Sequence, residues 1–369
     1  MYDRSKPYNE LPDLPPQTKI ENDLDILKKL VIASRSLASV NFNVMRLPNP
    51  FMLVNTIALQ EAKTSTEIEN IFTTEDELYK AISDTVREDK SDPATKEVLR
   101  YREALWAGYK TLQDSKEIDI HTIIRTFQKI KNTQQGIRPV QARIVIKRGQ
   151  SSIKPGEIIY TPPRGDKVLQ NLLNNLVEFL NDDSKYQMDP LLKMCIAHYQ
   201  FEAIHPFQDR NGRAGRILNL LYLTYKGLLS HPTLYLSKYI ILHKEDYYYN
   251  LGAVTERQSW KNWILFMLDA VDKTSQITNS LINDIVEQME STLEFGKSKF
   301  KWYTKELNEV LFSQPYIKQK TIGDVLNKSS RTTQLKYINS LIESNILRAQ
   351  KDGNEVYYLN DDLIRILGG

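Results

Sequence analysis

The chain has 369 residues, of which 41% are hydrophobic and 26% are charged, and this composition excludes a largely disordered protein. The 49 Lys and Arg residues nearly balance the 46 Asp and Glu residues, so the net charge of +3 does not indicate a nucleic-acid binder. The single cysteine, Cys195, excludes an internal disulfide framework and a cysteine-based zinc site. The sequence has no signal-peptide core, and no apolar run approaches the ~18 residues of a transmembrane helix, so we expect a cytoplasmic protein without membrane contact.

The first part of the chain predicts an extended arm followed by helices. Residues 1–22 carry several prolines, which prevent a regular helix, so this segment should lie along the body of the protein. Apolar residues then recur at three- and four-residue spacing in 24–37 and 52–62, which predicts two helices, the second ending near Lys63. Another helix should begin at Glu75, because the threonines before it can cap its free amides.

The middle of the chain is predicted to be helical apart from one hairpin. Two short β-branched runs, Arg143–Ile146 and Glu157–Tyr160, flank a stretch that contains Pro155 and Gly156, which indicates two strands joined by a loop. Helical periodicity occupies the segments on both sides of this hairpin: 95–131, 168–180, 191–203, 212–225 and 244–292.

The last seventy residues follow a different pattern. Three helical segments precede a hairpin around Asp352-Gly353, a pair that suits a tight turn. Helix-turn-helix followed by a hairpin is the order of elements in a winged helix. The predicted helices cover 306–312, 321–326 and 331–343. We divide the chain into an N-terminal region at 1–95, a core at 96–295 and a winged-helix-like domain at 296–369.

One loop contains several residues that can bind a ligand or take part in catalysis. Proline after His205 prevents the preceding helix from continuing, and a second apolar helix opens at Gly212. Amides at a helix start bind anions, and Arg213 and Arg216 lie one turn apart, where both can hold a polyphosphate. Asp209 is a hard oxygen ligand suited to magnesium held jointly with phosphate, and a histidine beside it can act as a general base. The alternative is a solvated helix corner, but this density of functional side chains favours a magnesium–polyphosphate site.

The segment HPFQDRNGRAGR, from His205 to Arg216, resembles the signature loop of the Fic family, HPFx(D/E)GNGRxxR. It departs at one position, where Arg210 replaces the family's glycine. The preceding AHYQFEAI, the strand-rich stretch that ends in IIYTPP, and the N-terminal EAKTSTEIENI are also similar to Fic proteins. The resemblance implies a mainly α fold, in which a Fic-type helical core carries a β-hairpin flap and a small C-terminal winged-helix domain.

The resemblance also implies an activity, the transfer of AMP from ATP to a Tyr, Thr or Ser hydroxyl of a protein, with Mg²⁺. Arg210 leaves two outcomes open: it strains the loop or crowds the nucleotide where the family needs glycine, or it adds a phosphate contact. The implied roles are His205 as general base, Asp209 as magnesium ligand, Asn211 and Gly212 as the cradle of the α-phosphate, Arg213 and Arg216 on the β- and γ-phosphates, and Phe207 as an apolar anchor of the loop.

A second motif resembles the inhibitory pattern (S/T)xxxE(G/N) of Fic proteins. It runs from Ser65 to Asn70, with Glu69 as its acid. The resemblance implies that Glu69 pairs with Arg216 and takes a group that should orient the γ-phosphate, and that it can also position a water for removal of AMP. The alternative is an ordinary surface residue on a helix.

Further site residues are suggested by position in the resemblance. Ile159 and Tyr160 lie on the hairpin that would dock an extended target segment by strand addition, although apolar residues there could equally cover the core. Tyr248 and Thr255 are candidates for contact with adenine, against the alternative that they pack within the fold.

Two other functions remain open at this stage. The chain could instead be a regulator that binds DNA or protein through residues 300–369, with an inactive or ligand-sensing Fic core. Arg331 and Lys336 would then lie on the recognition helix, and Arg348 and Lys351 on the wing. Alternatively, the core could transfer a different nucleotide such as UMP. A homodimer is possible, since Fic cores often pair.

Overall fold

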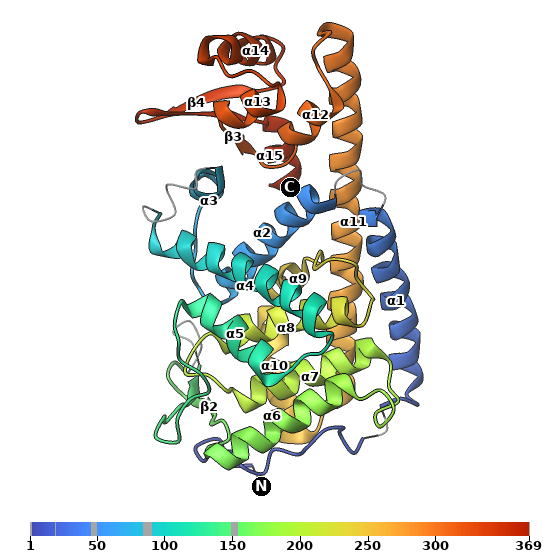
Figure 1. The fold of residues 1–369 in the computed structure, drawn as a ribbon. Helices are drawn as coiled ribbons and strands as arrows, with labels where there is room; N and C mark the ends of the chain where they lie inside the picture. The colour runs from blue at the N-terminus through green and yellow to red at the C-terminus, as the bar shows by residue number, and fades with distance from the viewer. Residues whose placement is uncertain (1, 19, 46–49, 84–90, 149–153, 369) are drawn as a thin grey trace.

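The computed structural model describes residues 2–18, 20–45, 50–83, 91–148 and 154–368, and within them the protein is mainly helical, as predicted. Fifteen helices and five short strands are present in these ranges. Most helices pack into one large core, while the last part of the chain forms a small module at one end (Figure 1). In the described ranges, none of the helices has both the length and the apolar character needed to cross a membrane.

The N-terminal arm lies on the core, as the prolines predict. Leu11, Leu14 and Ile20 are buried against it. The backbone of Leu14 is held by the side chain of Asn175, which accepts from its N–H at 2.7 Å and donates to its carbonyl at 3.2 Å. The arm therefore covers a face of the core through side chains and backbone together.

Two N-terminal helices follow. Helix α1 (Leu24–Met45) packs along the long helix α11 (Trp260–Lys299), and α2 (Pro50–Ile68) crosses the core beside α4 (Pro93–Ser115) and α9 (Leu236–Leu242) (Figure 1). The prediction that the second helix ends near Lys63 is wrong, because the helix continues to Ile68. Its polar last turns are buried and find partners: Thr64 bonds the Tyr235 hydroxyl at 2.5 Å.

Three helices with side-chain caps come next. Helix α3 (Glu75–Ser83) begins where predicted, and Thr74 Oγ1 accepts from the amide of Glu77 at 3.2 Å. Asp92 caps α4, and Asp119 caps α5 (Ile120–Lys131) through the amide of Thr122. These caps satisfy amides that a helix start leaves free.

The helices around the predicted loop form the centre of the core. They are α6 (Asp166–Asn181), α7 (Pro190–Ile204), α8 (Asn211–Tyr225) and α10 (Lys244–Arg257). Nearly every side chain of α7 is buried, including the polar residues Lys193, His198 and Gln200. Because α7 and α8 pack against each other, the loop between them is fixed at both ends.

The predicted hairpin is present but short. Strands β1 (Ile146–Lys147) and β2 (Ile158–Tyr160) pair antiparallel, with Ile146 opposite Tyr160. Part of the loop between them, residues 149–153, lies outside the described residues.

The C-terminal module has the predicted winged-helix order. Helices α12 (Lys305–Leu311), α13 (Gln319–Val325) and α14 (Arg331–Glu343) precede the hairpin of β4 (Arg348–Asp352) and β5 (Glu355–Leu359). Two short elements were not predicted: β3 (Tyr316–Ile317), which pairs with β5, and the final helix α15 (Asp361–Leu367). The proposed boundary at 295/296 falls within the last turns of α11.

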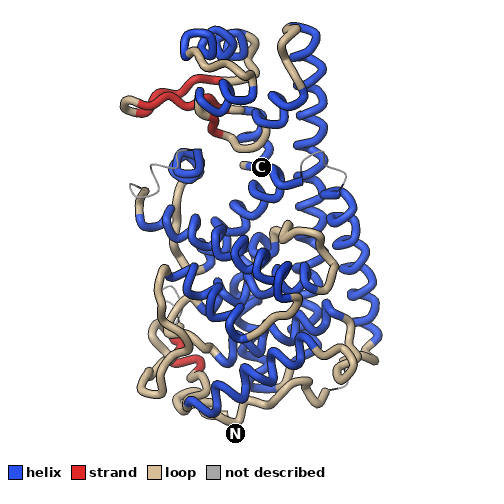
Figure 2. The backbone as a smooth tube through the Cα atoms, viewed as in Figure 1, coloured by secondary structure: helices blue, strands red, loops and turns tan. Residues whose placement is uncertain are grey.

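The module contacts the core through α3 and through the long helix α11 (Figure 2). The hydroxyl of Tyr316 on β3 donates to Asp76 at 2.7 Å, and Gln350 on β4 donates to the same carboxylate at 3.2 Å. Lys80 forms ion pairs with Asp76 and with Asp352 of the hairpin. The rings of Tyr79 and Tyr316 lie 5.6 Å apart between centroids.

Candidate active site

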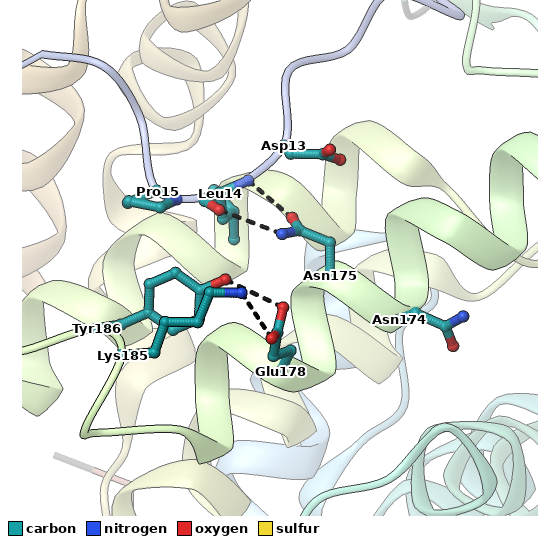
Figure 3. Close-up of a pocket in the computed structure, with 8 residues that line it drawn as sticks. All are labelled: Asp13, Leu14, Pro15, Asn174, Asn175, Glu178, Lys185 and Tyr186. Atoms are coloured by element: carbon teal, nitrogen blue, oxygen red, sulfur yellow. Dashed lines mark hydrogen bonds and ion pairs between the residues drawn. The ribbon is translucent and has the colours of Figure 1, made fainter.

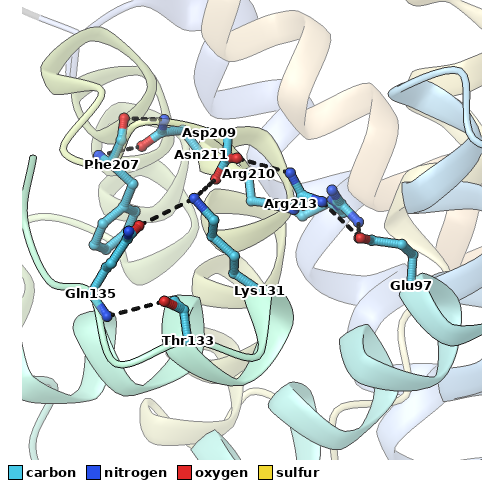
Figure 4. Close-up of polar contacts among 9 residues, drawn as sticks. All are labelled: Glu97, Lys131, Thr133, Gln135, Phe207, Asp209, Arg210, Asn211 and Arg213. Atoms are coloured by element: carbon cyan, nitrogen blue, oxygen red, sulfur yellow. Dashed lines mark hydrogen bonds and ion pairs between the residues drawn. The ribbon is translucent and has the colours of Figure 1, made fainter. Parts of the chain in front are cut away.

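The loop between α7 and α8 is braced from within. His205 ends α7 in a left-handed conformation (φ 51°, ψ 58°), and its amide bonds the carbonyl of Phe201 at 3.0 Å. The Asn211 side chain accepts from the amide of Phe207 and donates to its carbonyl, each at 2.9 Å (Figure 4). The Phe207 ring is fully buried and stacks on Phe127, with centroids 4.0 Å apart. The loop conformation is therefore fixed by protein contacts alone.

Arg138 is a site residue that sequence analysis missed. Its Nε donates to the carbonyl of His205 at 2.7 Å, and its Nη2 donates to the carbonyls of Ile204 and Pro163. Its own amide donates to Pro206 at 2.9 Å. One buried guanidinium thus ties the start of the loop to the segment after α5. Nothing in the pattern around Arg138 separates it from an ordinary surface arginine.

The imidazole of His205 is neutral in this environment. Burial and the nearby positive charge of Arg138 lower the pKa of His205 to about 4. Its Nδ1 has no hydrogen-bond partner in the structure. A neutral ring with an open nitrogen can accept a proton at pH 7.

Arg216 lies almost completely buried under the loop and is held by α2. Its Nε donates to Ser65 Oγ at 2.7 Å, and its Nη2 donates to the carbonyl of Ser65 at 2.9 Å and to Glu69 Oε1 at 2.8 Å. Burial is the largest single influence and would raise the pKa of Glu69. The charge and hydrogen bond of Arg216, together with the charges of Arg213 and Lys244, outweigh it, so the pKa lies below its ordinary value. The predicted pairing of Glu69 with Arg216 is therefore present as a contact.

Gly212 is required at its position by this ion pair. A Cβ atom there would lie 2.5 Å from Glu69 Oε1 and 3.0 Å from Arg216 Nη1. Any larger residue would have to displace the carboxylate, so the glycine makes room for the acid of α2 at the start of α8.

The charged residues of the loop form a continuous chain (Figure 4). Lys131 contacts Asp209 at 3.1 Å, and Arg210 contacts the other oxygen of Asp209 at 2.9 Å. Arg210 also donates to Glu97 of α4 at 2.7 Å, and the second oxygen of Glu97 accepts from Arg213. Glu97 was not among the predicted site residues, because a lone acid in a regular helix carries no local signal.

Arg210 has the backbone conformation that glycine favours. Its φ of 62° and ψ of 15° lie in the left-handed region. For a residue with a Cβ atom this costs roughly 1–2 kcal/mol. Of the two outcomes left open by sequence analysis, strain is thus present, and it is accompanied by ion pairs on both sides of the guanidinium.

Several buried polar atoms around the loop have no partner. They are His205 Nδ1, Arg210 Nε, Arg213 Nε and Glu202 Oε1. Burial raises the pKa of Glu202 to about 7, although the charge of Arg216 lowers it. Since buried polar atoms in proteins are nearly always hydrogen-bonded, this group points to a ligand that the loop binds.

The other predicted residues lie in varied settings. Tyr160 is buried, and its hydroxyl donates to the carbonyl of Ala203 at 2.7 Å, so its ring packs against the core. Ile159 on the same strand is only half-buried. Thr255 is buried and bonds the Tyr199 hydroxyl at 2.9 Å, whereas Tyr248 is 44% exposed.

A separate surface hollow of about 640 Å³ lies between the arm and α6 (Figure 3). None of its lining residues is a predicted site residue. They are Asp13, Leu14, Pro15, Asn174, Asn175, Glu178, Lys185 and Tyr186.

Comparison with solved structures defines the fold class. A Fic family protein from Desulfovibrio desulfuricans G20 has a TM-score of 0.56 and 20% identity, covering 94% of this chain and 98% of that one. Fic-1 from Caenorhabditis elegans has a TM-score of 0.51 and 19% identity, covering 69% and 73%. The helical core with its loop between α7 and α8 is thus a Fic fold.

Family models match most of the chain. Residues 27–110 match the Fic/DOC family N-terminal region, residues 111–223 the Fic/DOC family, and residues 287–363 the C-terminal domain described as protein adenylyltransferase SoFic-like. The chain belongs to the Fic/DOC family.

Curated relatives align over shorter segments. Protein adenylyltransferase fic-1 of Caenorhabditis briggsae is 41% identical over 68 residues, which is 18% of this chain and 13% of that protein. Protein adenylyltransferase Fic of Aedes aegypti is 26% identical over 148 residues, which is 39% and 28%. The chain therefore spans less than a third of the length of these two relatives.

Proposed function

We propose that this protein is an autoinhibited protein adenylyltransferase that transfers AMP from ATP to a Tyr, Thr or Ser hydroxyl of a protein. The observation that carries the proposal is the loop itself. A neutral histidine with an open nitrogen and two arginines with unpartnered Nε donors come from the same short segment, inside the region that matches the Fic/DOC family.

His205 acts as the general base. Its imidazole takes the proton of the target hydroxyl as that oxygen forms a bond to the α-phosphorus of ATP. The bond between the α-phosphorus and the oxygen bridging to the β-phosphate breaks, and pyrophosphate leaves with the electron pair of that bond. Such transfers depend mainly on positioning and charge stabilisation, so one base beside a rigid anion site supplies what the chain must contribute.

The amides at the start of α8 and the arginines bind the phosphates. Asn211 keeps the loop in shape by its two bonds to Phe207, so the first amides of α8 remain oriented toward an anion. Once Glu69 has moved away, Gly212 leaves space for close approach of the phosphates. Arg213 contacts the β-phosphate, and Arg216 contacts the γ-phosphate once Glu69 has left it.

Asp209 is the residue that would hold magnesium. Its carboxylate has the hard oxygen chemistry that Mg²⁺ prefers, and the described residues hold no cluster of three or more candidate metal ligands, so phosphate oxygens would complete the shell. Lys131 and Arg210 form ion pairs with this carboxylate, and these ion pairs would have to break before the metal binds. When bound, the metal would neutralise charge on the leaving pyrophosphate.

Autoinhibition rests on α2. Glu69 and Ser65 together use three donor contacts of the buried Arg216, so the γ-phosphate has to displace the Glu69 carboxylate before it can align. With Glu69 in place, ATP binds with its α-phosphate turned away from the line of attack. The same carboxylate could position a water for removal of AMP from a modified target.

The test uses purified full-length Glu69→Gly protein with ATP labelled at the α-phosphate and Mg²⁺. We expect label on protein, strong loss of label in Glu69→Gly/His205→Ala, and weaker labelling in the wild type. Omitting Mg²⁺ tests the metal, and UTP labelled in the same position tests the donor. No His205-dependent label with either nucleotide would contradict nucleotidyl transfer.

A regulatory role of the C-terminal module is less well supported. One of the predicted wing cations, Arg348, is held by Asp361 through two contacts of 2.7 and 2.8 Å. Arg331 and Lys336 on α14 are exposed. A salt-dependent shift of DNA that requires these two residues would revive this alternative.

A further inference from the structure

Glu97 occupies an unusual place among the charges of the loop. It lies on α4, more than a hundred residues from the loop in sequence, and its side chain is only 14% exposed. One oxygen accepts from Arg210 Nη2 at 2.7 Å, and the other accepts from Arg213 Nη1. A single carboxylate therefore joins two guanidinium groups of the loop.

The contacts of the two arginines leave the same atom open in each. Arg210 uses Nη1 for Asp209 and Nη2 for Glu97, while Arg213 uses Nη1 for Glu97. The Nε of each is buried without a hydrogen-bond partner. The Arg213 side chain is only 3% exposed, so its open donor needs a partner inside the site.

This arrangement has the properties of a preorganised anion site. A carboxylate that grips the outer nitrogens fixes the plane of each guanidinium, and a planar donor fork binds phosphate best when its orientation is set in advance. The pKa of Glu97 supports its role as a charged holder: burial would raise it, but the bond from Arg210 and the charge of Arg213 bring it below its ordinary value.

We propose that Glu97 is the positioning residue of the phosphate site, and that it aligns Arg213 and Arg210 so that their free Nε donors bind the β- and γ-phosphates of the nucleotide. Arg210 then supplies a phosphate contact where the related loops carry glycine. This inference rests on the proposed function, because it assumes that the loop binds a nucleoside triphosphate.

The strain at Arg210 is consistent with this role. A left-handed backbone disfavours any residue with a Cβ atom, and the ion pairs with Glu97 and Asp209 offset that cost. Glu97 acts on a different arginine from Glu69 and from a different helix, so the two acids have separable effects: Glu69 blocks Arg216, and Glu97 orients Arg213.

The experiment measures equilibrium binding of ATP, ADP and AMP to full-length protein in the Glu69→Gly/His205→Ala background, which frees Arg216 and prevents turnover. Glu97→Gln should raise the dissociation constant for ATP on the order of tenfold, because it removes the charge that holds two guanidinium groups. The binding of ADP should weaken less, and the binding of AMP should be unchanged. Asp114→Asn, which removes an exposed acid from the same helix, is the matched control.

A second variant covers the case in which Glu97→Gln folds poorly. Arg210→Gly removes the contact between Glu97 and Arg210 from the arginine side and also relieves the backbone strain. The binding of ATP should weaken about threefold to tenfold, and the binding of AMP should be unchanged. In the double variant the losses should be less than additive, since Glu97 acts partly through Arg210.

The outcomes separate this inference from the proposed function. Tighter ATP binding in Glu97→Gln would overturn it, because Glu97 would then compete with phosphate for Arg213. Equal loss of ATP and AMP would overturn it as well, because that indicates general damage to the site. If the parent background binds no ATP at all, the proposed function fails and this inference fails with it.

Discussion

The loop between α7 and α8 and the C-terminal module use charge in opposite ways. In the loop, arginines are buried and are held by acids from distant segments, as Arg216 is by Glu69 and Arg213 by Glu97. In the C-terminal module, Arg348 pairs with Asp361 and Lys318 with Glu355, within the module and near the surface. Buried long-range pairs depend on the whole fold, whereas exposed local pairs depend on their own segment and contribute little.

The largest expected effect is on stability and compares one arginine from each region. Arg216→Met leaves Glu69 without its buried partner and should lower the free energy of unfolding by about 3–5 kcal/mol. Arg348→Met removes an exposed pair and should cost less than about 1 kcal/mol. Urea denaturation of both variants measures the difference. Equal losses would show that burial does not separate the two regions.

A second prediction concerns the space at Gly212. In Gly212→Ala the new methyl group meets Glu69 Oε1, so the variant should lose about 1–3 kcal/mol of stability. The same substitution in Glu69→Gly protein removes this clash and should cost clearly less. Thermal unfolding of the four proteins in this cycle measures the coupling. Additive losses would mean that the carboxylate does not occupy this space.

The acidity of His205 predicts a pH profile. A base is active when deprotonated, and the pKa of His205 is lowered from 6.5 to about 4 by burial and by Arg138. The rate of labelling by Glu69→Gly protein at low ATP should therefore stay level from pH 7 to about 5. Below pH 4 it should fall about tenfold per unit. An acid limb near pH 6.5 would contradict the buried, neutral imidazole.

The smallest effect is expected where the C-terminal module meets helix α3 of the core. Tyr316→Phe removes the hydroxyl that donates to Asp76, while Gln350 and Lys80 still contact that carboxylate. We expect a loss of about 0.5–1.5 kcal/mol in urea denaturation. Tyr357→Phe, which removes the hydroxyl of another tyrosine in the same sheet, serves as a comparison variant. A loss of several kcal/mol would make this contact a main support of the module.

Local patterns account for what could be predicted of the fold. The helix at 331–343 was placed at its observed bounds, and the Asp352-Gly353 turn lies in the predicted hairpin, because spacing and turn chemistry are properties of neighbouring residues. The last turns of α2 were missed because they are polar in composition. What makes them helical and buried is contact with Tyr235 and Arg216, which are distant in sequence.

The candidate site divides in the same way. The residues of the loop itself stand together in one motif, and the family resemblance supplied the pairing of Glu69 with Arg216. Arg138 and Glu97 escaped notice because each is a single charge in an ordinary context, and its importance comes from what the fold places beside it. Their roles became visible only through contacts that no spacing rule encodes.

Helix α11 connects the helical core with the C-terminal module. At 1.5 Å per residue, its 40 residues extend about 60 Å. Its first half buries Trp263 in the core, and its second half holds the module through Met289, whose carbonyl accepts from Asn308, and through Gln288, which donates to Asp362. The module is therefore anchored on the same continuous helix that packs in the core. A force applied to the module would be transmitted to the core through α11.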